Sequence, residues 1–324
     1  MRALLLTGTG GTELLAVAEV PDASPVAGEV LVRVAAASVN YADILIRQGR
    51  YPLPPELPAV LGMEVAGDVV AADTGSGFSA GDRVMALTLP GRGFAELVAV
   101  PAATTFPLPA GMSYAEGSAF LLAFLTAFIP LTVQLRLGAG DTLLVHAAGG
   151  GVGTATVQLG RQLGARVLAT AGTEEKLAVA RELGAAVTVD YSREDWADRI
   201  REETAGAGVD AIVDPVGGEV FRQSLSLLRP LGAIAAIGFS AGTWEPIDPA
   251  LLVGRNVAVH GFYLGRLARL RPDAVADAVA SLVALWEAGE IRPYVGAEFS
   301  LDDAPAAHAL VEERRHIGKV VVLP

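Results

Sequence analysis

The chain has 324 residues, which suits two domains, and it is 52% apolar and 19% charged, as globular proteins are and disordered ones are not. Its formal net charge of -12 argues against nucleic acid or an anionic membrane as the main partner. It contains no cysteine, which excludes disulfides, thiolate zinc sites and a thiol nucleophile.

No segment has the pattern of an export signal or a membrane span. The N-terminal sequence MRALLLTGTGG has three leucines before polar turn residues, too few for a signal peptide. The most apolar run, residues 119–130, is about twelve residues long, whereas a membrane span needs roughly 20. We therefore expect a buried helix there and a soluble cytoplasmic protein.

The first part of the chain reads as short strands separated by glycine and proline. Strands are expected at residues 30–36, 64–71, 82–87 and 94–100, the last stopped by Pro101. This spacing suggests a small barrel. Residues 51–60, YPLPPELPAV, carry too much proline for a central strand and predict a stiff surface loop.

The middle of the chain alternates between strand and helix. Strands are expected in six apolar runs, at residues 142–145, 166–170, 187–191, 209–213, 233–239 and 256–262. Thr173 is placed to cap a helix that ends before Gly184, and Ser192 with Asp195 resembles a capping box. The alternation predicts a doubly wound parallel sheet.

The end of the chain predicts one long helix and one strand. The helix is expected over residues 272–288, with Gly289 as its terminator, and the strand over residues 319–324. A six-stranded sheet needs neither of them. We therefore expect both to return to the first domain.

The strongest functional signal is a glycine-rich turn, residues 145–160, which reads VHAAGGGVGTATVQLG. Gly150 and Gly151 let the backbone approach a pyrophosphate, and a helix beginning at Val152 would point N–H groups at it. Gly153 lets that helix pack close to the preceding strand. This strand–turn–helix context predicts a dinucleotide site.

Several motifs, in order along the chain, carry a resemblance to a known family. They are NYADILIRQGRYP at residues 40–52, LGMEVAGDVV at 61–70, GDRV at 81–84, AAGGGVG at 147–153, ATAGTEEK at 169–176, VDAIVDPVGG at 209–218 and GKVVV at 318–322. Over essentially its whole length the chain resembles a medium-chain dehydrogenase/reductase of the quinone oxidoreductase, zeta-crystallin-like branch. The resemblance implies a chaperonin-10-like (GroES-like) β-barrel catalytic domain, residues 1–123 and 263–324. A Rossmann NADP-binding domain, residues 124–262, is inserted in it, with a cleft between the two.

Two departures from the superfamily pattern favour its zinc-free branch. Zinc-dependent members carry a histidine where this chain has Met63, and they carry cysteine ligands, which this chain lacks. The four histidines, His146, His260, His308 and His316, show no metal-ligand spacing. We therefore expect no metal and no Lewis-acid mechanism, and we expect His146 to be structural.

The end of the second parallel strand favours NADPH. NAD recognition normally uses an acidic residue there, but residues 169–172 read ATAG. In the resembled family the positions of Gly172, Lys176 and Tyr191 contact the 2′-phosphate of NADPH. The alternative is that Lys176 is a solvated helix lysine, and Glu174 and Glu175 must face away if NADPH is the cofactor.

The resemblance also implies the remaining site residues. It places Asn40 and Tyr51 near the nicotinamide and the substrate as catalytic candidates, with Tyr51 either donating a proton or stacking. The other implied cofactor contacts are Thr126, Gly150, Gly151, Val152, Gly238, Phe239, Ser240, Phe262, Tyr263 and Arg314, with Lys319 a further candidate. Asp43 is expected to be structural, and Leu45 is expected to make the pocket apolar.

Together these features predict an NADPH-dependent, zinc-independent oxidoreductase that passes a hydride to a quinone or a similar conjugated small molecule. An enoyl or 2-alkenal reductase shares the fold and is the alternative, with Tyr51 or an ordered water supplying a proton. A non-catalytic NADPH-binding protein, as among the crystallin relatives, is a second alternative. A homodimer through sheet-edge strands is a further expectation from the family.

Overall fold

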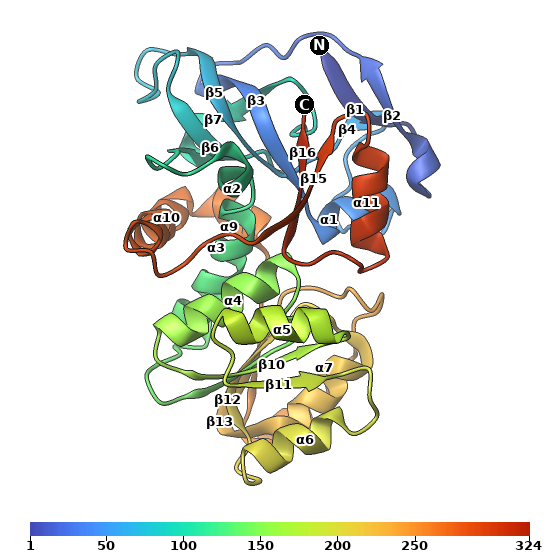
Figure 1. The fold of residues 1–324 in the computed structure, drawn as a ribbon, viewed down its shortest axis with the longest axis vertical. Helices are drawn as coiled ribbons and strands as arrows, with labels where there is room; N and C mark the ends of the chain where they lie inside the picture. The colour runs from blue at the N-terminus through green and yellow to red at the C-terminus, as the bar shows by residue number, and fades with distance from the viewer. The chain divides into compact units, whose positions relative to one another are not determined.

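The computed structural model describes all 324 residues, which form two compact units (Figure 1). The first unit comprises Met1–Leu122, Gly265–Val283 and Arg292–Pro324, and the second comprises Ala123–Leu264 and Ala284–Ile291. The observed boundaries fall at 122/123 and 264/265, one and two residues from the expected boundaries at 123/124 and 262/263. The short segment Ala284–Ile291, expected in the first domain, belongs to the second unit.

The first unit is built on a seven-stranded sheet of order β15-β16-β3-β5-β6-β8, with β7 also paired to β3. Its strands are β3 (Glu29–Val39), β5 (Glu64–Ala72), β6 (Arg83–Leu87), β7 (Leu97–Pro101), β8 (Thr105–Pro107), β15 (Val295–Ser300) and β16 (Lys319–Leu323). A second sheet of order β2-β1-β4 contains β1 (Arg2–Leu6), β2 (Leu15–Glu19) and β4 (Ala59–Val60). Since β16 pairs antiparallel with β3, the expected return of the last strand to the first domain is confirmed.

Helices join and cover these sheets. Those of the first unit are α1 (Tyr41–Arg47), α2 (Tyr114–Ser118) and α11 (Ala304–Glu312), with 3-10 turns at Thr12–Leu14 and Ala102–Thr104. The chain passes between the units within α3 (Leu121–Ile129), α9 (Leu264–Leu270) and α10 (Pro272–Glu287). The buried helix expected near residues 119–130 is therefore α3, and the long C-terminal helix is α10.

The second unit is a six-stranded parallel sheet of order β11-β10-β9-β12-β13-β14. Its strands are β9 (Thr142–Val145), β10 (Arg166–Ala171), β11 (Val187–Asp190), β12 (Val209–Asp214), β13 (Leu228–Ala236) and β14 (Ala258–Gly261). Its helices are α4 (Gly151–Gln162), α5 (Glu174–Glu182), α6 (Trp196–Glu203), α7 (Gly218–Ser224) and α8 (Pro249–Arg255), with short turns at Pro130–Gln134 and Leu225–Leu227. The strand order reverses beside β9, so the expected doubly wound sheet is confirmed.

Several strands differ from the sequence prediction at their ends, and tertiary contacts explain two of these differences. The strand expected at residues 94–100 begins only at Leu97, since the preceding residues bond to β1: the Leu4 N–H donates to the Phe94 carbonyl at 2.8 Å. β13 ends at Ala236, three residues early, because the following chain runs beside the end of β12 instead of β14. There the Ser240 N–H donates to the Pro215 carbonyl at 3.1 Å.

Two other local predictions are also corrected. The expected capping box at Ser192 and Asp195 is wrong, because the Ser192 backbone and hydroxyl both donate to Asp190 Oδ1, at 2.9 and 2.7 Å, and α6 begins only at Trp196. The loop expected over residues 51–60 is two residues shorter, since Ala59–Val60 pairs with β1 as β4.

Candidate functional site

The glycine-rich turn lies at the carboxyl end of β9. α4 begins at Gly151, one residue before the expected start, and Ala147 turns the chain with a positive φ of 50°. A Cβ added to Gly153 would lie 2.2 Å from the Ala147 carbonyl oxygen, so only glycine lets the helix start so close to the turn. A Cβ at Gly150 would meet only the Ala147 carbonyl oxygen, at 3.4 Å, so the backbone of Gly150 is not covered by other protein atoms on the side where its Cβ would lie.

Beside the turn, His146 is a buried structural group. Its ring nitrogens lie 2.8 Å from the Thr170 hydroxyl and 2.8 Å from the Ser224 hydroxyl, and its ring meets Trp196 edge-on at 5.3 Å. Burial lowers the pKa of His146 to about 3, so the ring is neutral. It links β9 to β10 and α7 and holds the base of the turn.

Next to the turn, the predicted 2′-phosphate residues come together at the ends of β10 and β11. The Lys176 stem packs on the turn, because a Cβ at Gly149 would lie 2.6 Å from the Cβ and Cγ of Lys176. A Cβ at Gly172 would lie 3.5 Å from Cε2 of Tyr191, whose N–H donates to the Ala171 carbonyl at 3.1 Å. The structure therefore places Gly172 against Tyr191, and it places Lys176 against Gly149, which sequence reasoning missed.

The residues expected beyond the fifth and sixth strands lie at the same carboxyl edge of the sheet. Gly238 sits against the end of β12, where a Cβ would lie 2.9 Å from the Pro215 carbonyl oxygen. The Phe239 ring packs on Trp244 at 4.7 Å, and the Phe262 N–H donates to the Ala236 carbonyl at 3.2 Å. Ser240 and Tyr263 adjoin these residues, and Thr126 is half-buried on α3.

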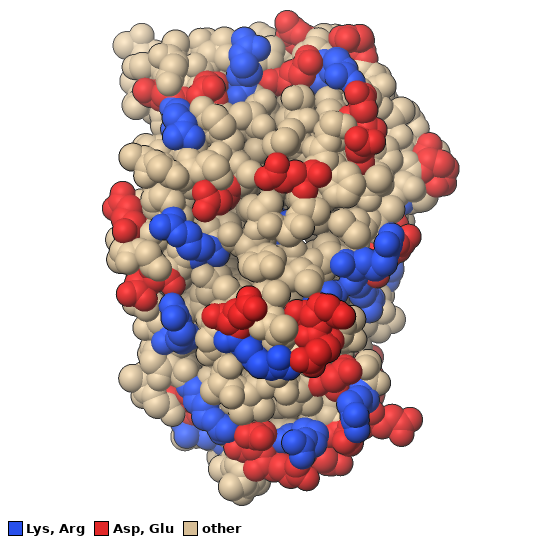
Figure 2. Space-filling model, in the orientation of Figure 1, with Lys and Arg blue, Asp and Glu red and all other residues tan.

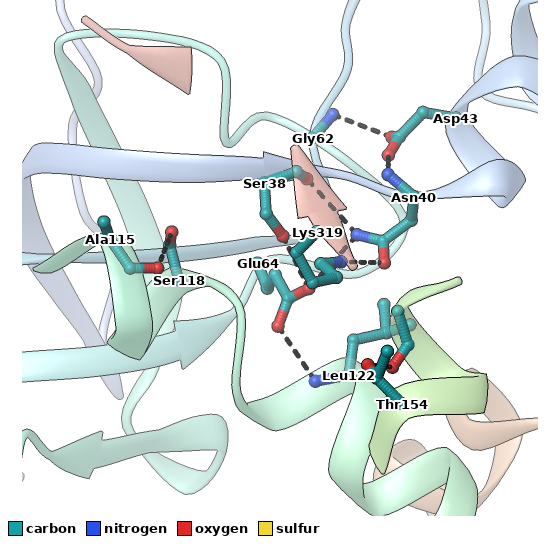
Figure 3. Close-up of polar contacts among 11 residues, drawn as sticks. Ser38, Asn40, Asp43, Gly62, Glu64, Ala115, Ser118, Leu122, Thr154 and Lys319 are labelled. Carbon is teal, nitrogen blue, oxygen red and sulfur yellow. Dashed lines mark hydrogen bonds and ion pairs between the residues drawn. The ribbon is translucent and has the colours of Figure 1, made fainter. Parts of the chain in front are cut away.

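The first unit holds a buried polar cluster where β3, β5 and β16 meet (Figure 3). The Lys319 ammonium donates to Glu64 Oε1 at 2.9 Å and to Asn40 Oδ1. Asn40 Nδ2 donates to Glu64 Oε1 and to the Ser38 carbonyl, both at 3.2 Å. Glu64 also accepts from the Ser38 hydroxyl at 2.7 Å and, through Oε2, from the Leu122 N–H at 2.9 Å. The amide of Asn40 is thus held in one orientation by a desolvated ion pair.

Sequence reasoning found Asn40 but missed Glu64, and it placed Lys319 only as a candidate cofactor contact. The relative exposures of Glu64 and Lys319 are 0% and 4%. Charged residues are almost never so buried unless they are paired, so a lysine opening the strand KVVVL and a glutamate opening another apolar strand were the available signal.

Asp43 ties α1 to the chain before β5. Its carboxylate accepts from the Asn40 N–H at 2.9 Å and from the Gly62 N–H at 3.1 Å. Burial raises the pKa of Asp43 to about 7, an effect that these hydrogen bonds reduce. Leu45, expected to make the pocket apolar, and Met63, which stands in place of the zinc-binding histidine, are both buried, with exposures of 6% and 1%.

The remaining catalytic and cofactor candidates of the first unit are Tyr51 and Arg314. Tyr51 opens the proline-rich loop and is half-buried against the core of that unit. Arg314 follows α11 at a positive φ of 56° and is exposed. Asn40, Tyr51, Arg314 and Lys319 thus belong to the first unit, while the other predicted cofactor residues belong to the second.

Three further observations concern metals, membranes and polyanions. Nowhere do three or more His, Cys, Asp or Glu side chains gather as a metal site would require. None of the helices combines the length and apolarity needed to cross a membrane. On the face shown in Figure 2, acidic and basic side chains are interspersed and form no continuous basic patch.

Two family models match the chain. The alcohol dehydrogenase GroES-like domain matches residues 26–110, and the zinc-binding dehydrogenase model matches residues 151–283. The quinone oxidoreductase of Pseudomonas aeruginosa is 34% identical over 317 residues, 97% of each chain. The human synaptic vesicle membrane protein VAT-1 homolog is 35% identical over 344 residues, covering 100% of this chain and 86% of its own.

Among solved structures, the Escherichia coli quinone oxidoreductase complexed with NADPH matches with a TM-score of 0.94 at 30% identity, over 100% of both chains. Together with the GroES-like match, this confirms the expected fold class of a Rossmann sheet with a GroES-like domain. The chain therefore belongs to the medium-chain dehydrogenase/reductase superfamily, in its quinone oxidoreductase-like family.

Proposed function

We propose that this oxidoreductase uses NADPH to reduce quinones or similar conjugated acceptors by hydride transfer. The observation that carries the proposal concerns the end of β10, where no carboxylate stands: Gly172 lies against Tyr191 there, and Lys176 of the following helix packs on the glycine turn at Gly149. A lysine beside a strand end without an acidic residue suits a 2′-phosphate and not a free ribose hydroxyl. The similarity to quinone oxidoreductases over the whole chain supports the acceptor class.

The residues of the second unit fit this cofactor. The first N–H of α4 that bonds within the helix is that of Thr154, which donates to the Gly150 carbonyl at 2.8 Å. The N–H groups of Gly151, Val152 and Gly153 therefore precede the helical ladder and suit pyrophosphate oxygens. When bound, NADPH supplies the hydride, and the residues of the protein bind it, orient it and exclude water.

We assign Asn40 and Tyr51 to the nicotinamide and the acceptor. Lys319 and Glu64 hold the Asn40 amide, so this group is preorganised and keeps one orientation during turnover. A quinone needs no dedicated acid, because its reduced oxygen takes a proton from water. An activated alkene would need a proton placed on one face, and Tyr51 is the candidate donor.

We also propose that the reaction needs no zinc. The support is chemical: Met63 stands where zinc-dependent relatives carry histidine, and the chain has no cysteine to serve as a ligand. Full activity after exhaustive chelation is the expected result. Stoichiometric zinc whose removal abolishes activity would overturn this part of the proposal.

A homodimer through β14 is proposed on similar grounds. β14 is an edge strand of the parallel sheet, and the neighbouring α8 has no buried residue. Large apolar side chains are exposed on and before that helix, namely Trp244, Ile247, Leu251 and Val253. Light scattering of the purified protein tests the dimer. A cytoplasmic location stays a prediction.

The decisive experiment follows oxidation of NADPH against a panel of quinones, enals and enoyl thioesters. Turnover of quinones, with Tyr51→Phe retaining most of kcat and changing mainly KM, supports the proposal. Turnover of enals alone, with Tyr51→Phe lowering kcat by about 10²- to 10⁴-fold, would assign the protein to alkene reduction. Tight NADPH binding without turnover of any acceptor would favour a non-catalytic role.

A further inference from the structure

We propose that Arg181 strengthens the preference for NADPH without touching the cofactor, by neutralising Glu174 at the start of α5. The inference rests on the proposed function, in which Lys176 binds the 2′-phosphate of NADPH. Arg181 lies two helical turns beyond Glu174, near the C-terminal end of the same helix. It would act as a positioning and charge-compensating residue for the phosphate site.

The start of α5 carries two negatively charged side chains close to the position proposed for the 2′-phosphate. Glu174 and Glu175 occupy its first turn, directly before Lys176. The positive end of a helix dipole attracts carboxylates and phosphates alike, so these side chains compete with a bound phosphate for the same field. An uncompensated carboxylate there would repel the 2′-phosphate and favour NADH.

Arg181 neutralises the carboxylate of Glu174 and holds it in one position. Its Nη2 donates to Glu174 Oε1 at 2.6 Å, and its Nε donates to the Thr188 hydroxyl of β11 at 2.9 Å. A helix turns about 100° per residue, so Glu174 and Arg181 share one face while Lys176 lies about 200° around the helix from Glu174. The ion pair therefore holds the carboxylate along the face opposite Lys176.

The neighbouring carboxylates have other partners. The pKa of Glu175 is lowered by a backbone N–H and by the Thr173 hydroxyl, which hold it at the helix end. Asp190 accepts both the N–H and the hydroxyl of Ser192. Among these three acidic residues, Glu174 has the partner with a full opposite charge, and that partner lies outside the group of residues assigned to the phosphate.

The test compares cofactor affinities of four variants by fluorescence titration. They are Arg181→Gln, Glu174→Gln, the double variant carrying both changes, and Arg199→Gln as control. Arg199 is a matched control because it forms an exposed ion pair with Glu202 at 2.7 Å on α6 of the same unit, so its loss changes the net charge equally. Binding of NADPH and NADH is measured at low and high ionic strength.

We expect Arg181→Gln to raise the Kd for NADPH about two- to fivefold at low salt, to leave NADH unchanged, and to lose its effect at high salt. The double variant should return to the parent affinity, because it removes both charges, and Arg199→Gln should match the parent. Equal effects of the Arg181 and Arg199 variants would overturn the proposal. So would a double variant as weak as Arg181→Gln alone, since Arg181 would then contact the phosphate itself.

The variant Lys176→Ala, measured in the same titrations, distinguishes a failure of the proposed NADPH site from a failure of the proposed role of Arg181. If Lys176→Ala loses affinity for NADPH alone and Arg181→Gln changes neither affinity, the role of Arg181 is overturned and the NADPH site at Lys176 is supported. A parent protein that binds NADPH and NADH equally, with a silent Lys176→Ala, overturns the cofactor assignment and the role of Arg181 with it.

Discussion

At the scale of single residues, we expect Lys176 to contribute most to the choice between NADPH and NADH. Its Cβ, Cγ and Cδ pack on Gly149, so this part of the side chain has less rotamer freedom than that of an ordinary surface lysine. A long side chain whose rotamers are already restricted loses less entropy when it binds a phosphate. The charge of Lys176 should therefore contribute to affinity close to the full value of a charged hydrogen bond.

Lys176→Ala should weaken NADPH binding by roughly 10- to 150-fold, because a charge-assisted hydrogen bond contributes about 1.5–3 kcal/mol. The affinity for NADH should hardly change. Titration with both cofactors checks this expectation. Equal losses for the two would mean that Lys176 supports the fold of the turn and does not read the phosphate.

Lys319→Met should destabilise the protein by about 3–5 kcal/mol, since it leaves the fully buried Glu64 carboxylate without its counter-ion. The double variant Lys319→Met with Glu64→Gln should recover a large part of that loss, because no uncompensated charge remains. Urea unfolding of both variants and the parent measures the difference. A single variant as stable as the parent would show that the pair carries little of the stability of the first unit.

At the scale of secondary-structure elements, local pattern predicted those elements whose ends are set locally. The apolar run of β9 and the Thr173 cap of α5 were predicted correctly, since each depends on neighbouring residues. The end of β13 and the start of α6 were not, because hydrogen bonds to the end of β12 and to Asp190 decide them. The cluster of Asn40, Glu64 and Lys319 escaped prediction for the same reason, since only the sheet register brings its members together.

Glycine substitutions at the turn should separate folding from binding. Gly153→Ala places a Cβ 2.2 Å from the Ala147 carbonyl oxygen and should cost about 1–3 kcal/mol of stability. Gly150→Ala meets nothing nearer than 3.4 Å and should keep the stability but weaken NADPH binding, because its methyl group enters the space assigned to the pyrophosphate.

Gly254→Ala is the matched control for both, since a Cβ on that glycine of α8 meets no atom within 4 Å. It should leave NADPH binding unchanged and be neutral or slightly stabilising. Thermal unfolding and NADPH titration distinguish the three variants. A Gly153→Ala protein as stable as the parent would contradict the close packing of α4 against the turn.

At the scale of the whole molecule, the buried aspartates and the buried histidines change the stability of the fold in opposite directions as the pH changes. Burial raises the pKa of Asp43 to about 7 and of Asp214 to about 6, so the stability that these carboxyls contribute is lost as pH rises through those values. Burial lowers the pKa of His146 and His308 to about 3, so their contribution is present above the ordinary histidine pKa and is lost as pH falls. Between about pH 4 and 6 the two effects largely cancel.

His308→Gln should expose this balance. In the parent, His308 is fully buried and packs edge-on against Phe94 at 5.5 Å. In the parent, protonation of His308 in the unfolded chain favours unfolding as the pH falls, and the variant lacks this group. The free energy of unfolding of the variant should therefore rise relative to that of the parent, by up to about 1.4 kcal/mol per pH unit below about pH 6. Urea unfolding at several pH values between 4 and 7.5 measures this slope. A pH-independent difference would show that His308 is not neutral in the folded protein.

The position of β16 also has a consequence for the protein as it leaves the ribosome. Glu64 is translated early, but Lys319 lies 255 residues further along, and β16 pairs with β3 inside the sheet. Most of the second unit, Ala123–Leu264, is one continuous stretch and can fold before residues 319–323 are made, whereas until then the first unit lacks an interior strand and the lysine of its Glu64–Lys319 ion pair. A nascent chain can therefore acquire its nucleotide fold well before the Asn40 amide is oriented, and a stop codon placed before Lys319 would leave a folded second unit joined to an unfinished first unit.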